Sequence, residues 1–241
     1  CFINFWIPLI SFPLALIGFL DDKKGIPATF RYLIQISTVI ILVFKSQLMK
    51  NILILGLNNQ IEVFLVILLI FAGTAVINFV NFMDGLDGFL AVNIIIIFCM
   101  AIYSGNLVLI PITSALMGFL IWNWSPAKVF MGDVGSTFLG SIYLAITLNT
   151  ESFKGSFSLV IIAIPLLGDA FICVLRRFIN GENIFRPHKL HLYQRLNQAG
   201  ISHSNVCFIY AFLTLITCFY VLKFDLNNSK FWIIFWYCTI C

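Results

Sequence analysis

Apolar runs recur along this whole chain, and several of them approach the length that is needed to cross a lipid bilayer. A transmembrane helix takes about 20 consecutive, mainly apolar residues. The chain is 61% hydrophobic and 10% charged, whereas soluble domains are roughly 45–50% apolar and about 25% charged. The sequence therefore predicts an all-α polytopic membrane protein, with a single integral membrane domain over residues 1–241.

About nine transmembrane helices are expected from these apolar runs. A further segment at 51–61 is too short to cross and is expected to form a hairpin or to lie in the membrane interface. The predicted spans are 1–20, 32–44, 62–80, 89–103, 107–122, 136–148, 157–176, 205–222 and 231–241.

If successive spans alternate in direction, the connecting loops divide into two sets. One set comprises residues 21–31, 81–88, 123–135 and 176–204, and it holds more Lys and Arg residues than the other set. The positive-inside rule makes this set cytoplasmic. Most acidic residues and the paired histidines also lie in it. Cytoplasmic loops are therefore expected to form the active site.

The stretch NFVNFMDGLDG gathers polar residues at the end of an apolar run. Asn78 and Asn81 are three residues apart, so on a helix they share a face. Asp84 follows, and Gly85 and Gly88 allow the backbone to bend and to approach a ligand. Amide and carboxylate oxygens suit a hard cation such as Mg²⁺. A polar helix end with a glycine turn is the alternative, but it does not easily explain so many polar side chains at a membrane boundary.

The stretch DDKKG places two adjacent acids at the end of the first apolar run. Asp21 and Asp22 repel each other unless a cation or hydrogen-bond donors offset their charges. Lys23, Lys24 and Arg31 follow within a short loop. The alternative is an ordinary helix end with lysines that extend to the membrane surface.

The stretch GDVGS sets Asp133 between Gly132 and Gly135. Small neighbours leave space for a phosphate or a metal ion, and the hydroxyl of Ser136 could donate a hydrogen bond. Such a turn is weak by itself. Its position on the same side as the other acidic loops strengthens the interpretation as a site.

The most basic stretch is RRFINGENIFRPHKLHLYQRL, whose arginines suit phosphate recognition. His188 and His191 could bind zinc, but no third nitrogen or sulfur ligand lies near them in the sequence. Hydrogen bonding to phosphate is therefore expected of at least one histidine. A positive-inside anchor would explain the arginines but not the histidine pair. Asp169 lies inside a predicted span and is a functional candidate, and the cysteines are expected to be small apolar fillers.

Taken in order, DDKKG, NFVNFMDGLDG, PAKVFMGDVGS and HKLHLYQRL resemble the four signature segments of the polyprenyl-phosphate N-acetylhexosamine-1-phosphate transferases. The last segment, with the RR and GE before it, looks most like the branch that starts lipopolysaccharide O-antigen units. The resemblance implies that undecaprenyl phosphate attacks the β-phosphorus of a UDP-N-acetylhexosamine and releases UMP. It also implies a Mg²⁺ requirement, with Mn²⁺ as an alternative, and a location in the bacterial inner membrane.

The resemblance also assigns roles to residues of this chain. A phosphate monoester has a second pKa near 6, so the lipid phosphate is largely dianionic at pH 7 and a general base is not strictly needed. Asp21 is then as readily a positioning group as a base. Family chains carry two further spans upstream, which are expected to be missing here. The implied residues are Asp21, Asp22, Asp84 and Asp133 for catalysis, Asn81 and Asp133 for the metal, and Asn78, Asp87, Asn123, Arg31, His188, His191 and Arg195 for substrate.

Rival interpretations remain open at this point. A transporter would place charges inside spans, where Asp169 is the clear example. A catalytically inactive scaffold is favoured if the absent upstream segment is essential, and a CDP-alcohol phosphotransferase would show a denser aspartate pattern. The net charge of +4 comes without a basic cluster interleaved with aromatics, so no nucleic-acid partner is expected. The apolar surface would allow a homodimer, and the sugar is not identified.

Overall fold

The computed structural model describes residues 6–183 and 188–223, and every regular element within them is a helix. The first five residues of the predicted span 1–20 and the whole predicted span 231–241 lie outside the described residues. The all-α prediction is confirmed for the described part of the chain.

The helices begin and end close to the predicted limits, because the apolar runs that suit a helix are bounded by Gly, Pro, Asn and charged residues. The segment at 51–61 forms the end of a short helix, α3 (Gln47–Ile54), a turn, and the first residues of the next helix, which begins at Asn59. The helices at the predicted spans are α1 (Trp6–Lys24), α2 (Ala28–Lys45), α4 (Asn59–Phe82), α5 (Phe89–Tyr103), η1 and α6 (Leu107–Leu109 and Ile110–Asn123), α7 (Gly132–Leu148), α8 and α9 (Phe153–Ile162 and Ile164–Ile179) and α11 (His203–Lys223).

Three of the described helices, α2, α4 and α11, are long and apolar enough to cross a membrane. Helices α8 and α9 add a fourth span if they act as one, although they are bent by 74° where they meet. Pro165 lies in the first turn of α9 and has no backbone N–H to continue the α8 ladder, which explains the break. The chain is a multi-pass membrane protein, but the predicted number of nine spans is not confirmed.

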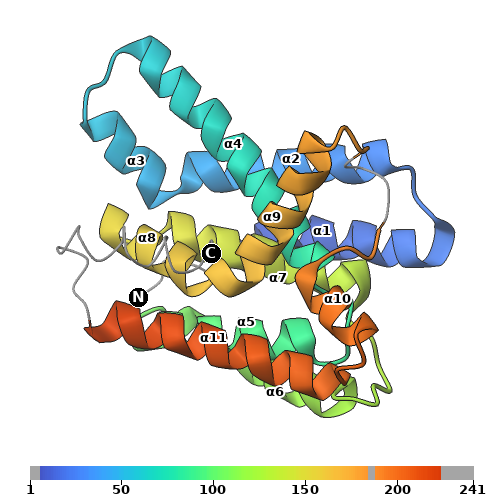
Figure 1. Ribbon diagram of the computed structural model, residues 1–241. Coiled ribbons are helices and arrows are strands. Elements are labelled where there is room, and N and C mark those ends of the chain that lie inside the picture. Colours follow the sequence, from blue (N-terminus) through green and yellow to red (C-terminus); the bar gives the residue numbers. More distant parts are fainter. Residues whose placement is uncertain (1–5, 184–187, 224–241) are drawn as a thin grey trace.

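Helix α7 lies at the centre of the packing. It is buried without interruption from Leu139 to Leu148, as expected of a helix that is enclosed on all sides. Helices α1 and α4 pack directly against it, while α5, α6 and α11 form a separate layer on the other side (Figure 1). Large apolar side chains such as Phe71, Ile121 and Phe212 are exposed on the outer helices, as expected for a surface that contacts lipid.

Glycines set how closely α1 and α4 approach α7. A Cβ atom on Gly18 of α1 would lie 2.7 Å from the backbone carbonyl carbon of Asp133. A Cβ atom on Gly140 of α7 would lie 3.2 Å from the Cα atom of Ile77 in α4. The first of these contacts holds the end of α1 against the beginning of α7, and so it places the acids of both helices side by side.

We expect Gly18→Ala to destabilise the protein by about 1–3 kcal/mol, because the added methyl group overpacks a contact with backbone that cannot move aside. Gly118→Ala on α6 is the matched control, since a Cβ atom there meets nothing within 4 Å. Thermal unfolding in detergent measures both. Equal melting temperatures for the two variants would contradict the proposed close contact.

Candidate active site

Four carboxylates from three separate segments lie together at one edge of the helix bundle. Asp21 and Asp22 are in the last turn of α1, Asp84 is in the loop after α4, and Asp133 is in the first turn of α7. Gly132 has a φ of +61°, and a Cβ atom on it would lie 2.7 Å from Oδ2 of Asp22. The three acidic motifs of the sequence therefore share one place, although their roles in chemistry stay predictions.

Arg31 connects two of these acids. It lies in the first turn of α2, which the short turn after α1 directs back toward the acids. Its Nη1 atom donates to Oδ2 of Asp133 at 2.8 Å and also to Oδ2 of Asp21. Oδ1 of Asp21 accepts the backbone N–H of Ile26 at 2.7 Å. Arg31 thus offsets charge on both sides of the site and fixes the position of each carboxylate.

Asn81 contacts Asp133 from the end of α4. Its amide nitrogen donates to Oδ1 of Asp133 at 2.9 Å and to Oγ of Ser136 at 2.8 Å. Ser136 in turn donates to the carbonyl oxygen of Gly132 at 2.8 Å. The amide oxygen of Asn81 accepts no hydrogen bond from residues 6–183 or 188–223. It therefore remains available as a ligand.

Negative charge in this cluster is only partly offset. Burial, helped by the neighbouring carboxylates of Asp133 and Asp22, raises the pKa of Asp84 to about 7. In the part of the chain that the structure describes, neither Asp22 nor Asp84 forms an ion pair. Carboxylate oxygens and one free amide oxygen, with unbalanced negative charge, fit a hard divalent cation such as Mg²⁺.

A pocket of about 180 Å³ opens beside these acids. Two predicted substrate-binding residues, Asp87 and Asn123, lie on its wall, but their polar atoms also hold the surrounding loops. Asn123 accepts the N–H of Gly88 at 3.1 Å and donates to the carbonyl oxygen of Val129 at 2.8 Å. Oδ2 of Asp87 accepts the N–H of Ala127 at 3.2 Å. The pocket is lined by Asp84, Gly85, Leu86, Asp87, Asn123, Phe130, Met131 and Gly132.

Two other residues that were predicted to bind substrate form no hydrogen bond with the acids or with the pocket residues in the described part of the chain. The amide of Asn78 donates to the carbonyl oxygen of Thr74, one turn earlier in the same helix, at 2.9 Å. The side chain of Arg195 is exposed and has no polar partner in the described residues. Asn78 and Asn81 share a helix face, but only the amide of Asn81 contacts an acid of the cluster. Asn78 lies almost one turn farther from the end of the helix.

The two histidines lie just before α10 (Leu192–Gln198), and His191 packs against Phe82 at the end of α4. The ring of His191 is buried between His188 and Phe82, with ring centroids 4.9 and 5.9 Å away. Burial lowers the pKa of His191 to about 4, and the charges of His188 and Arg177 add to this effect. Burial and Arg177 also lower the pKa of His188. Both rings are therefore held in the neutral form near pH 7.

Asp169 fixes the start of α10, next to the two histidines. Its two carboxylate oxygens accept the backbone N–H groups of Leu192 and Tyr193, at 2.8 and 3.0 Å, at the start of α10. The hydroxyl of Tyr210 in α11 donates to it at 2.7 Å. The hydroxyl of Tyr193 donates to the carbonyl oxygen of Phe82 at 2.8 Å. A buried carboxylate needs such donors, so Asp169 has a clear structural role in fixing α10.

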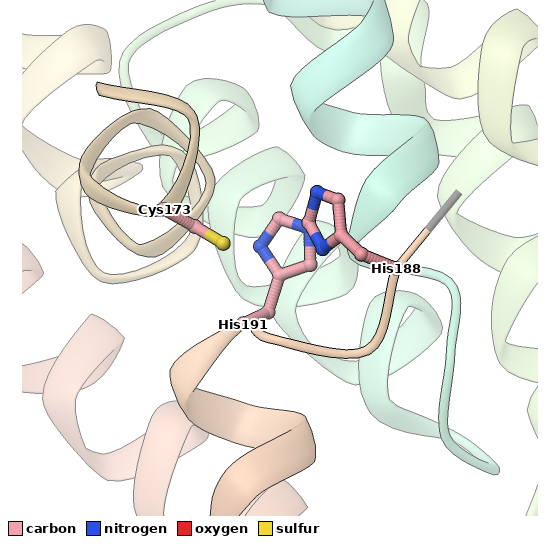
Figure 2. Close-up of side chains that lie close together, drawn as sticks. All are labelled: Cys173, His188 and His191. Atoms are coloured by element: carbon pink, nitrogen blue, oxygen red, sulfur yellow. The ribbon is translucent and has the colours of Figure 1, made fainter. Parts of the chain in front are cut away.

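Cys173 is a residue that sequence reasoning missed. It lies on α9, and its sulfur points toward the two histidines (Figure 2). One ligand atom from each of the three residues lies within 4.8 Å of the others. The sequence showed no third ligand near the histidine pair, because Cys173 reaches them only after the chain turns back from the end of α9. Cys173 is buried, as expected of an apolar filler, but its sulfur also lies beside two imidazole rings.

The fold and the acidic cluster define a multi-pass helical membrane protein with a site suited to a cation and an anionic ligand. Residues 5–151 match the family model described as glycosyl transferase family 4, a range that includes the first three signature segments but not the fourth. The chain belongs to this family, and the resemblance to polyprenyl-phosphate N-acetylhexosamine-1-phosphate transferases is confirmed.

Named relatives agree with this assignment. The chain is 30% identical over 215 residues to a probable undecaprenyl-phosphate N-acetylglucosaminyl 1-phosphate transferase of Bacillus subtilis, covering 80% of this chain and 58% of the relative. It is 29% identical over 228 residues to a decaprenyl-phosphate N-acetylglucosaminephosphotransferase of Mycobacterium leprae, covering 79% and 56%. It is 30% identical over 234 residues to a phospho-N-acetylmuramoyl-pentapeptide-transferase of Staphylococcus saprophyticus, covering 86% and 72%. The chain thus spans just over half the length of the first two relatives.

We expect Asp169→Asn to loosen the start of α10, because an amide cannot accept hydrogen bonds through its nitrogen and one donor loses its partner. The expected loss is about 1–3 kcal/mol of unfolding free energy. Hydrogen exchange of the Leu192 and Tyr193 amides, followed by mass spectrometry, should become faster. Tyr210→Phe is the control, since it removes one donor and leaves both capping bonds. Unchanged exchange in Asp169→Asn would show that the carboxylate does not hold the helix.

Proposed function

We propose that this protein transfers an N-acetylhexosamine 1-phosphate group from a UDP-sugar to undecaprenyl phosphate, at the edge of the membrane, and releases UMP. The observation that carries this proposal is the cluster of Asp21, Asp22, Asp84 and Asp133, the first and last of them bonded to Arg31, in a member of glycosyl transferase family 4. The printed names of the relatives describe polyprenyl-phosphate N-acetylglucosamine phosphotransferases and a phospho-N-acetylmuramoyl-pentapeptide transferase. They support an N-acetylhexosamine donor.

In the proposed reaction, an oxygen of the lipid phosphate attacks the β-phosphorus of the UDP-sugar. The bond from that phosphorus to the oxygen bridging the two phosphates breaks, and UMP leaves with this oxygen. Asp133, the amide oxygen of Asn81 and nearby Asp84 would hold Mg²⁺ or Mn²⁺, which when bound would neutralise charge on the diphosphate. Because the lipid phosphate is already largely dianionic at pH 7, Asp21 is proposed to position this group and not to remove a proton.

The other polar residues are proposed to position substrate around the acids. Arg31 donates to both Asp21 and Asp133 and so fixes the spacing between these two acids. Its positive charge would also limit the repulsion between the acids and the incoming phosphates. Asp87 and Asn123 would shape the adjacent pocket for the nucleotide or diphosphate. Asn78 and Arg195 are proposed as more distant contacts to substrate. A direct substrate contact is less favoured for His191, because that ring is buried against Phe82 and Asp169.

We propose that the protein lies in the bacterial inner membrane with this site on the cytoplasmic face. The shorter apolar helices, α5 and α6, are proposed to cross or enter the membrane, as are α1 and α7. The number of spans would then be closer to the expected nine. Exposed apolar side chains on α1 and α6, including Leu9, Phe12 and Ile121, support this arrangement. The excess of Lys and Arg in the loops that carry the acids supports the orientation.

A transporter is less well supported than a transferase. That alternative depended on charge inside a predicted span, and Asp169 was its clear example. The carboxylate of Asp169 is fully engaged with the start of α10 and with Tyr210. The start of O-antigen synthesis remains our proposal for the pathway, and a peptidoglycan or other cell-envelope glycan is the alternative that the names of the relatives favour.

The first test is UMP release by the full-length protein in detergent, with undecaprenyl phosphate, Mg²⁺ and a panel of UDP-N-acetylhexosamines. We expect lipid-dependent and metal-dependent UMP release, and a fall of about 100-fold or more in Asp133→Asn, because a charged group at the reacting centre is lost. Glu151→Gln, an exposed acid outside the cluster, should retain full activity. If the wild-type protein releases no UMP with any donor, the transferase proposal is wrong and transport becomes the leading hypothesis.

Arg31→Lys tests whether this residue organises the acids. Lysine keeps the charge but lacks the planar, multiple-donor group that reaches two carboxylates. We expect kcat to fall about 10-fold, equivalent to about 1.4 kcal/mol, with little change in the KM for the UDP-sugar. Arg31→Gln should be less active still, and Lys50→Gln on the distant α3 should behave as wild type. A higher KM at unchanged kcat would instead assign Arg31 to ground-state binding of a substrate phosphate.

A further inference from the structure

We propose that Cys173, His188 and His191 together bind a zinc-type metal ion, at a site distinct from the acidic cluster. One candidate ligand atom of each residue lies within 4.8 Å of the other two. The cysteine comes from α9, and both histidines come from the loop before α10 (Figure 2). The three side chains therefore join two segments that are separated in the sequence.

The donor atoms select the class of metal. One sulfur and two imidazole nitrogens suit Zn²⁺, which is usually held by Cys and His, whereas Mg²⁺ prefers oxygen ligands. The acidic cluster offers only carboxylate and amide oxygens as metal ligands. The two sites would thus take different ions. Three protein ligands leave one position of a tetrahedral zinc ion for water or another oxygen.

The surroundings of these residues are those of a built site. His191 is 2% exposed and Cys173 is 8% exposed. The Nδ1 atom of His191 is buried and has no hydrogen-bond partner in the described residues. The nearest carboxylate oxygen, on Asp169, is 3.9 Å away, which is too far for a hydrogen bond. Buried polar atoms are almost always satisfied, so an unsatisfied imidazole nitrogen next to a thiol indicates a missing partner.

Local charge also favours a divalent cation. Arg177 is the nearby cation that acts on both histidines, and its side chain donates to Glu182 at 3.0 Å and to the carbonyl oxygen of Asn183 at 2.7 Å. This pair is neutral overall. When the metal binds, the thiol of Cys173 loses its proton to water and becomes a thiolate. The charges of that thiolate and of Asp169 together would balance a 2+ ion.

The metal would hold α9 against the loop that carries both histidines. Asp169 already holds the start of α10 through two backbone N–H groups, and the metal would fix the residues just before that point. This role would replace the substrate contact predicted for His188 and His191. The metal site does not involve Asp133 or Arg31. An experiment can therefore refute the proposed transferase activity without refuting the proposed metal site, and the reverse.

The test is the zinc content of the full-length protein, purified without a polyhistidine tag. The protein is stripped with a chelator, reloaded with Zn²⁺, desalted and measured by inductively coupled plasma mass spectrometry. We expect about one tightly bound zinc per chain. Cys173→Ser and His191→Gln should each lose most of it. The matched controls are Cys218→Ser, another buried cysteine, and His203→Gln, a histidine outside the trio, and both should keep it.

A second measurement uses the wild-type protein alone, so that it does not depend on the folding of any variant. Alkylation of each cysteine is followed by peptide mass spectrometry, with and without Zn²⁺. Zinc should slow the modification of Cys173 by about 10-fold or more, because a metal-bound thiolate is a poorer nucleophile, and it should leave Cys207 and Cys218 unchanged. Failure of the reloaded wild-type protein to hold zinc would overturn the proposal, as would zinc binding that leaves the alkylation of Cys173 unchanged.

Discussion

Repulsion among four carboxylates at the beginning of α7 is the constraint on which the arrangement of this site depends. Acids of like charge this close together disfavour ionisation. Burial is the main cause of the raised pKa of Asp84, and the neighbouring carboxylates of Asp133 and Asp22 raise it further. Three features offset the repulsion: the guanidinium of Arg31, the amide of Asn81, and the N-terminal end of α7, where the helix dipole favours negative charge. Gly18 and Gly132 provide the space, since a side chain at either position would displace the acids.

Much of the fold could be predicted from the sequence, because apolar runs set helix positions with little help from tertiary contacts. The range 89–103 coincides with α5, and 205–222 differs from α11 by only a few residues. The number of spans could not be predicted equally well. A run such as 157–176 has the composition of one span, but Pro165 ends the α8 ladder and a bend divides it.

The gathering of the acids was predictable for a different reason. The loops with Asp21, Asp84 and Asp133 follow apolar runs that, as alternating spans, were expected to end on the same side, and short loops would keep such residues near one membrane surface. What could not be predicted was which atoms meet. The pairing of Arg31 with both Asp21 and Asp133 depends on how α2 packs. The roles of Asp169 and Cys173 likewise depend on where α10 is placed against α9.

The oxygen-rich cluster and the cysteine–histidine cluster are joined by the loop after α4. Tyr193, at the start of α10, donates its hydroxyl to the carbonyl oxygen of Phe82 and lies so close to Gly85 that a Cβ atom there would collide with it. Asp84 lies between these two contacts. Tyr193 therefore contacts the chain on both sides of Asp84, so the placement of α10 bears on where this carboxylate lies. Asp169, and in our proposal a zinc ion, hold α10, so the residues that position Asp84 include some that never touch the substrate.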